Sequence, residues 1–268
     1  MELKIYHAFW GMEGTLREKM ERAARHGYDG VEGPLPAPED ENEFNELREE
    51  LGLSYISQIY THGHHEESFL AQVERAVKFR PQLINSHSGK DYWQEDEQDR
   101  FFAYAVDVEK QFGVPIGHET HRGRAMFSPW STARLLRQFP ELRLTADYSH
   151  FTCVCESLLH DQEEAMAIIL DRTIHLHARI GFEQGPQVPH PAAPEYAYAL
   201  ERFEGWWETV LQRRKSEGHQ VTTMTPEFGP PGYMPRIPYT AQPVADLFEV
   251  NHWTAGRLRE RYRHLTSI

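Results

Sequence analysis

Four side chains that commonly bind metal ions stand at the ends of four separate strand-like segments of this sequence. They are Glu119, Asp147, His177 and Glu227. Three carboxylates and one imidazole suit a divalent cation such as Mn²⁺, Mg²⁺, Co²⁺ or Zn²⁺. Because long stretches of chain separate these residues, they form one site only if the fold brings each of them to the same place.

Strand-like segments alternate with helical patterns along the whole chain. The strand-like segments are 3–8, 28–33, 53–60, 82–88, 114–120, 142–149, 173–180 and 220–229. The helical segments that follow them are 14–27, 40–52, 66–79, 94–112, 129–138, 156–170, 195–217 and 241–264. Repeated strand–helix units without a break in composition predict a single (β/α)8 TIM barrel, one domain spanning residues 1–268. An open doubly wound sheet is the alternative, but no G-x-G-x-x-G motif follows the first strand.

The alternation of side chains along a strand predicts that the four ligand candidates share one rim of this barrel. Successive residues point to opposite faces of a strand, so Asp147 shares its face with Thr145. Each candidate is then the last inward residue before a loop at the carboxyl ends of the strands, where barrel enzymes build their active sites. A single carboxylate there is usually a helix cap or a surface charge. Several carboxylates on one rim repel one another unless a cation neutralises them, which favours a metal site.

Other polar residues are expected close to the same rim, where they would contact the substrate or orient the metal ligands. They are Glu32, His87, His121, His150 and Arg179. Each of these histidines, taken alone, is equally well explained as a hydrogen-bonded structural residue. His175 is expected deeper in the barrel, in support of His177.

Two long loops rich in proline and glycine, residues 181–194 and 228–240, follow the last two strand-like segments. Both are expected on the face that carries the ligand candidates, either as parts of the active site or as stiff packing loops. The histidine-rich stretch at 61–65 is interpreted as a polar loop rather than a second metal site, because adjacent residues rarely converge on one ion.

The composition excludes some classes of partner. A formal net charge of −13 disfavours binding to nucleic acid. No apolar run approaches the length of a membrane span, and no basic leader precedes an apolar stretch. We therefore expect a soluble cytoplasmic protein without nucleic-acid or membrane partners. Cys153 and Cys155 are expected to be reduced thiols near the rim, because a C-x-C disulfide ring is unusually small.

Taken together, these motifs resemble the xylose-isomerase-like TIM-barrel superfamily of sugar and sugar-phosphate isomerases and epimerases. The segments that carry the resemblance are GYDGVEG (27–33), HETHRGR (118–124), ADYSH (146–150), HLHAR (175–179) and TPEFG (225–229). The resemblance covers most of the chain. It implies one divalent metal ion bound by the four strand-end residues, a small-molecule sugar substrate and, as in many members, a homo-oligomer.

The resemblance also implies a mechanism. In ketose 3-epimerases of this superfamily, the two glutamate ligands act as acid and base on opposite faces of the substrate. Carried over to this sequence, Glu119 and Glu227 are the catalytic pair, and the metal stabilises a cis-enediolate. The epimerases place a substrate-binding arginine six residues after the histidine ligand, where this sequence has Glu183. Arg179 is nearer in the chain, and the identity of the sugar stays open.

Three other functions stay open as well. A metal-dependent lyase acting on a keto-sugar or a glycoside would use the same enediolate chemistry. An endonuclease IV-like zinc hydrolase would use rim histidines such as His87 and His150. The D-x-H motif of these enzymes corresponds to Val188-Pro189-His190 in this sequence, so its aspartate is missing. The acidic net charge also opposes a DNA substrate. A degenerate barrel that only binds a sugar has no need of a complete ligand set.

Overall fold

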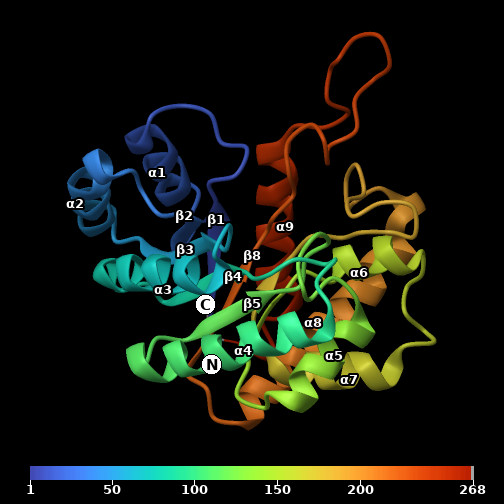
Figure 1. Cartoon of the computed structure of the whole chain (residues 1–268). Coiled ribbons are helices and arrows are strands. Elements are labelled where there is room, and N and C mark those ends of the chain that lie inside the picture. Colours follow the sequence, from blue (N-terminus) through green and yellow to red (C-terminus); the bar gives the residue numbers. More distant parts are fainter. Residues whose placement is uncertain (267–268) are drawn as a thin grey trace.

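A closed barrel of parallel strands, surrounded by helices, forms the centre of the molecule (Figure 1). The computed structural model describes residues 1–266. The strands pair in chain order, and β1 closes the barrel by pairing in parallel with β8. The predicted (β/α)8 barrel is confirmed, and the open-sheet alternative is wrong, because an open sheet leaves both of its edge strands unpaired.

The strands and helices alternate as the sequence pattern predicts. The strands are β1 (Glu2–Ala8), β2 (Gly30–Pro34), β3 (Ser54–Tyr60), β4 (Leu83–His87), β5 (Ile116–Glu119), β6 (Leu144–Ala146), β7 (Thr173–His177) and β8 (Val221–Thr225). The helices are α1 (Leu16–Arg25), α2 (Glu41–Leu51), α3 (His65–Ala76), α4 (Glu95–Phe112), α5 (Pro129–Gln138), α6 (Tyr148–Cys155), α7 (Glu163–Arg172), α8 (Ala197–Ser216) and α9 (Leu247–Arg261). Short 3₁₀ turns lie at Pro38–Asp40, Val77–Phe79 and Pro194–Tyr196.

The main difference from the predicted elements follows β6. The sequence pattern predicts a strand over 142–149 and a helix over 156–170, but β6 is shorter and α6 begins at Tyr148. Asp147 is the N-cap of α6, and its Oδ1 accepts a hydrogen bond from the backbone N–H of Ser149 at 3.0 Å. A carboxylate at this position satisfies an exposed N–H group of the first helical turn, so the chain enters a helix directly after the strand.

The extra helix α6 also changes the setting of the two cysteines. Cys153 and Cys155 are free thiols, as expected, and they lie half-buried on α6, the helix that follows β6. Burial raises the pKa of the Cys155 thiol to about 11. A thiol with a raised pKa is largely protonated near neutral pH and is a poor nucleophile, which fits a structural role.

The interior of the barrel divides into an apolar layer and a polar layer. Ile56 and Leu83 form a small buried apolar cluster with Tyr6. Gln58 and Asn85 follow two residues later on the same strands and point to the same interior face. The interior therefore becomes polar toward the carboxyl ends of the strands, where the ligand candidates lie.

The connection between β8 and α9 projects from the body of the molecule (Figure 1). Its outer part is an arm in which Arg236 pairs with Pro243 in an antiparallel bridge, and Tyr239 at its tip is exposed. Helix α9 begins later than predicted, at Leu247, because Asp246 is its N-cap and accepts a hydrogen bond from the N–H of Glu249. Within residues 1–266, no helix combines the length and apolar character required to cross a bilayer.

Candidate metal centre

The four ligand candidates meet at the carboxyl ends of β5 to β8. Glu119 ends β5, Asp147 follows β6, His177 ends β7 and Glu227 follows β8. Each of them offers one ligand atom, and these atoms all lie within 4.8 Å of one another. All four side chains are buried. We call these four residues the quartet.

Two atoms of the quartet are suited to hold a metal ion. Among the described residues, neither Glu119 Oε1 nor His177 Nδ1 makes a hydrogen bond, although both are buried. His177 Nδ1 lies 2.9 Å from Glu227 Oε2 and 3.7 Å from Glu119 Oε1. Because buried polar atoms are normally paired, two such atoms beside a further carboxylate fit a divalent cation that would take up their lone pairs.

The carboxylates also set the charge of the imidazole between them. Burial by itself lowers the pKa of His177, but the negative charges of Glu227, Glu32 and Glu119 outweigh burial and hold this pKa well above its usual value. A proton and a metal ion therefore compete for His177, and binding of a metal at Nδ1 would release a proton.

Glu32 fixes the orientation of His177. Its Oε1 lies 2.8 Å from His177 Nε2, its Oε2 lies 3.1 Å from His175 Nε2, and the hydroxyl of Thr225 donates to Oε2. A proton on Nε2 of His177, donated to Glu32, leaves Nδ1 to face the quartet as a lone-pair donor. Glu32 was predicted as a substrate contact, but it is fully buried and does not line the pocket, so the structure places it to orient the histidines.

Asp147 is the member of the quartet whose oxygens already have protein partners. Its Oδ2 forms an ion pair with Arg179 Nη2, and its Oδ1 caps α6. Burial raises the pKa of Asp147 to about 6, and the guanidinium of Arg179 opposes this rise. A metal ion bound to Oδ2 would have to share this oxygen with Arg179.

Arg179 is fully buried within the site. Its Nη2 donates to His150 Nε2 at 2.8 Å and lies 3.9 Å from Glu227 Oε2. The guanidinium lies over the ring of Tyr233, with 4.6 Å between its central carbon and the ring centroid. By contrast, Glu183 accepts a hydrogen bond from Tyr198 and does not line the pocket. Arg179, and not position 183, therefore supplies a positive charge beside the quartet.

A row of rings in tilted contact borders the quartet. Ring centroids are 4.5 Å apart for Tyr60 and His87, 5.0 Å for His87 and His121, and 3.9 Å for His121 and His150. His87 Nε2 lies 2.6 Å from Glu119 Oε2. Burial lowers the pKa of His121 to about 3 and holds that of His150 well below its usual value, so both rings are neutral near pH 7.

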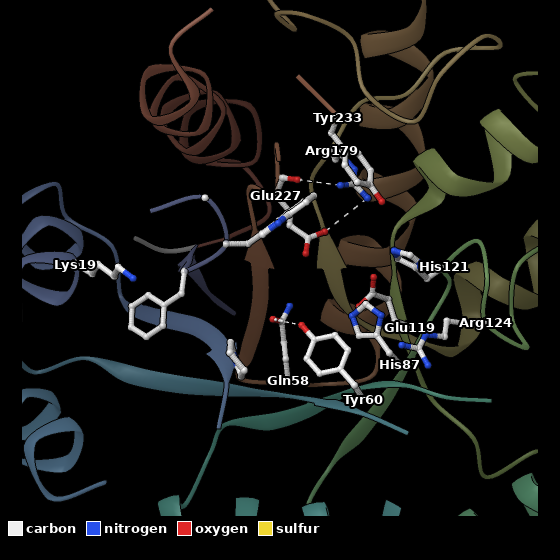
Figure 2. A pocket seen from close by; sticks show the side chains of 14 residues that line it. Lys19, Gln58, Tyr60, His87, Glu119, His121, Arg124, Arg179, Glu227 and Tyr233 are labelled. Atoms are coloured by element: carbon white, nitrogen blue, oxygen red, sulfur yellow. Dashed lines mark hydrogen bonds and ion pairs between the residues drawn. The ribbon is translucent and has the colours of Figure 1, made fainter. Parts of the chain in front are cut away.

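A pocket with a volume of about 600 Å³ opens onto the quartet (Figure 2). Its charged and imidazole lining residues are Lys19, His87, Glu119, His121, Arg124, Arg179 and Glu227. The rest of its wall is formed by Phe9, Trp10, Gly11, Pro34, Gln58, Tyr60 and Tyr233. Asp147, His177 and His150 lie behind this surface. The size is typical of a small-molecule site.

The two long loops are joined beside this pocket. Gln187 accepts a hydrogen bond from the N–H of Gly229 at 2.7 Å and donates to its carbonyl at 3.2 Å. Gly229 also lies directly against Trp10, since a Cβ atom at this position would be 2.1 Å from the indole ring. These contacts join residues 181–194 and 228–240 into one wall and hold Trp10 at the pocket.

Sequence reasoning missed several polar residues of the site, among them Asn85 beside the quartet and Lys19 and Gln58 in the pocket wall. Asn85 donates from Nδ2 to Glu119 Oε2 at 2.7 Å and to Glu32 Oε1 at 3.2 Å. Its position two residues before His87, on the same face of β4, was a usable signal. Arg124 was expected, with His121 and Arg122 of the HETHRGR segment, as a supporting residue of the site, and the structure places it in the wall of the pocket.

Comparisons with known proteins agree with this architecture. Residues 20–184 match the model of the xylose isomerase-like TIM barrel family. A xylose isomerase-like TIM barrel protein from Mycobacterium smegmatis, solved with magnesium, is 10% identical, with a TM-score of 0.67 and 98% of each chain covered. A D-tagatose 3-epimerase-like protein is 15% identical, with a TM-score of 0.61, covering 99% of this chain and 98% of that one. A sugar phosphate isomerase/epimerase from Parabacteroides distasonis is 12% identical, with a TM-score of 0.63, and the match covers 99% of this chain and 96% of that one.

At these identities, the solved structures show a common fold and no more. A search of curated proteins found no match. The family model, however, spans more than half of the sequence, and it agrees with the closed barrel and with the motifs at the strand ends. The chain belongs to the xylose isomerase-like TIM barrel family.

Proposed function

We propose that the protein is a divalent-metal-dependent isomerase or epimerase that acts on a sugar or a sugar derivative. The observation that carries this proposal is the buried quartet, in which Glu119 Oε1 and His177 Nδ1 lack hydrogen bonds among the described residues. Membership of the xylose isomerase-like family supports it. So does the magnesium in the related structure from Mycobacterium smegmatis.

The quartet would hold one ion, with Glu32 orienting its imidazole ligand. When bound, a divalent ion would polarise the carbonyl oxygen of the substrate and stabilise the negative charge of an enediolate. Mn²⁺, Mg²⁺, Co²⁺ and Zn²⁺ all accept such a set of three carboxylates and one imidazole.

Glu119 and Glu227 are the residues that would transfer the proton. Both carboxylates line the pocket; Glu119 ends β5 and Glu227 follows β8. Although burial by itself raises the pKa of Glu119, the neighbouring His87 and His177 hold it well below its usual value. An ionised carboxylate held in place by hydrogen bonds can remove a proton from the carbon next to a carbonyl, and the second carboxylate can return one.

Small sugars fit this site better than a DNA backbone does. The net charge of −13 opposes binding to the polyanionic backbone of nucleic acid, and the position of the missing endonuclease aspartate is Val188, which is fully buried. We therefore propose a small-molecule substrate, and three tightly bound zinc ions per chain would contradict this choice.

Exchange of protons with solvent tests the proposed reaction. The Mn²⁺-loaded protein is incubated in D₂O with a panel of ketoses and aldoses, and deuterium next to the carbonyl is measured by NMR and mass spectrometry. We expect deuterium in a product that has the formula of its substrate. A product that has lost water or another leaving group identifies a lyase instead. Full exchange by both Glu119→Gln and Glu227→Gln would overturn the assignment of the acid and base.

A further inference from the structure

We infer that the pocket takes an anionic substrate, and that Arg124 binds its terminal oxyanion, a carboxylate or a phosphate. The inference names the substrate class for the proposed function and rests on that function. A neutral sugar is the alternative that it excludes.

Arg124 stands in the wall of the pocket beside the quartet. It follows β5 on the HETHRGR loop, is half-buried, and lies beside His87 and Glu119 in the view of the pocket (Figure 2). Its Nη1 donates to the carbonyl oxygens of Thr61 at 3.1 Å and Gly89 at 3.5 Å. Among residues 1–266, these two neutral carbonyls are its only hydrogen-bond acceptors, and the carboxylates whose charges act on it, Glu119 and Asp91, form no direct ion pair with it.

The free edge of Arg124 has the geometry that an oxyanion requires. Nε and Nη2 lie side by side on one edge of a guanidinium and can donate two parallel hydrogen bonds to the two oxygens of one anionic group. Nη1, which donates to the two carbonyls, does not belong to this edge of the guanidinium. The bonds that anchor Arg124 therefore leave its bidentate edge available to a ligand.

The loops that anchor Arg124 are themselves joined to one another. The hydroxyl and N–H of Thr61 both donate to the carbonyl of His87, and the N–H of Gly89 donates to the Thr61 hydroxyl at 2.9 Å. Next to Arg124, the N–H of Ala125 donates to the carbonyl of Ser88. A side chain held in this way loses little conformational freedom when it binds a ligand, which is the property expected of a recognition residue.

The other cations of the pocket differ from Arg124. Arg179 is already paired with Asp147, and Lys19 lies on α1, far from Arg124 across the pocket (Figure 2). A half-buried positive charge without a direct ion pair is costly, and a negative ligand in contact with it lowers that cost. Arg124 and the quartet line the same pocket, so one small acid can contact both.

The rest of the wall suits the body of such an acid. Trp10, Phe9 and Tyr60 present aromatic surface to the pocket, and Gln58 offers a polar amide close to Tyr60 (Figure 2). Aromatic faces pack against the carbon–hydrogen surface of a sugar ring or chain, while Arg124 fixes one end. The end bound by Arg124 then determines which carbon lies between Glu119 and Glu227.

Matched pairs of sugars test this inference on the Mn²⁺-loaded full chain. The probes are D-galacturonate against D-galactose, D-glucuronate against D-glucose, and D-fructose 6-phosphate against D-fructose. Affinity is measured by calorimetry and by the shift in melting temperature. We expect at least one acid to bind about tenfold or more tighter than its neutral partner, because a charged bidentate contact is the strong kind. The two uronates test whether the pocket binds a carboxylate, and the sugar phosphate tests whether it binds a phosphate. The inference is overturned if no acid exceeds its neutral partner.

Substitutions at Arg124 test the residue itself. Arg124→Lys keeps the charge but lacks the bidentate edge, so we expect the melting temperature without ligand to stay near that of the wild type while the preference for the acid falls about tenfold. Arg124→Met should remove the preference. Arg100→Met is the control, because Arg100 is an exposed arginine outside this pocket that pairs with Glu66. Full acid preference in both Arg124 variants overturns the inference.

The inference and the proposed function can fail separately. Deuterium exchange into a neutral ketose that Arg124→Met leaves unchanged would keep the proposed reaction and overturn the anionic substrate. Conversely, Arg124-dependent binding of an acid without any proton exchange would keep the substrate class and overturn the reaction.

Discussion

His177 Nε2 lies 2.8 Å from Glu32 Oε1, and this bond turns the other ring nitrogen of His177 toward the quartet. Glu32 comes from β2 and His177 from β7, so the contact exists only because the barrel closes. The buried carboxylate thereby determines which nitrogen is offered to a metal.

Glu32→Gln is expected to lower metal affinity by about ten- to hundredfold, because the neutral amide supports the imidazole less strongly. Metal content after dialysis and calorimetric titration with Mn²⁺ measure this effect. The melting temperature of the metal-free variant, compared with that of metal-free wild type, shows whether the fold has also changed. Unchanged metal affinity in a folded variant would contradict the positioning role.

Asp147→Ala is expected to reduce both metal occupancy and stability. The change removes the N-cap of α6, which is worth about 1 kcal/mol. It also leaves the buried guanidinium of Arg179 with only the more distant Glu227 as a carboxylate partner, at a cost of up to about 3–5 kcal/mol. Chemical denaturation of the metal-free protein measures the free energy of unfolding. The double variant Asp147→Ala/Arg179→Met should regain part of the loss, and a double variant less stable than Asp147→Ala would contradict this account.

Metal binding is expected to stabilise the protein. A ligand that binds only the folded state, present at a hundred times its Kd, raises the free energy of unfolding by about 2.7 kcal/mol. We expect Mn²⁺ to raise the melting temperature of the wild type and EDTA to reverse the effect. His177→Ala, which removes the imidazole ligand, should show no such shift. If none of Mn²⁺, Mg²⁺, Co²⁺ and Zn²⁺ changes the melting temperature of the wild type, the alternative of a degenerate barrel that only binds a sugar is favoured.

Stability is also expected to fall in mild acid because of His7, which lies away from the quartet. Burial, opposed by the hydrogen bond to the backbone of Ala8 and aided by the positive charges of Arg22, His26 and His252, lowers the pKa of His7 to about 4. The unfolded chain has the ordinary value near 6.5 and takes up a proton first as the pH falls. Above pH ~6.5, His7 is neutral in both states and the stability is at its full value. As the pH falls from ~6.5 to ~4, only the unfolded chain takes up the proton, and the free energy of unfolding decreases by about 3 kcal/mol.

Denaturation curves of the wild type and of His7→Gln at a series of pH values check this prediction. The variant has no imidazole at position 7, so its stability should change less between pH ~6.5 and ~4 than that of the wild type. An equal loss of stability in both proteins over this window would show that other groups are responsible.

The barrel and the sidedness of its ligands could be predicted because both depend on local patterns. The alternation of strand and helix periods indicates βα units, and the twofold period of a strand indicates which residues share a face with Asp147 or His177. The start of α6 was missed because the strand-like pattern of 142–149 continues through Asp147, whose capping bond depends on local backbone geometry.

The depth of each side chain and its partners were decided by the tertiary structure alone. Glu119 ends β5 and lines the pocket, whereas Glu32, which was expected to end its strand, is the middle residue of β2 and lies buried beside His175 and His177. The tilt and stagger of strands in a closed barrel determine these levels, and no single strand encodes them. In the same way, the pairing of Arg179 and the open edge of Arg124 depend on groups far away in the sequence. The chain by itself thus determined the barrel and its ring of ligands, while barrel closure decided which residues orient the ligands and which face the substrate.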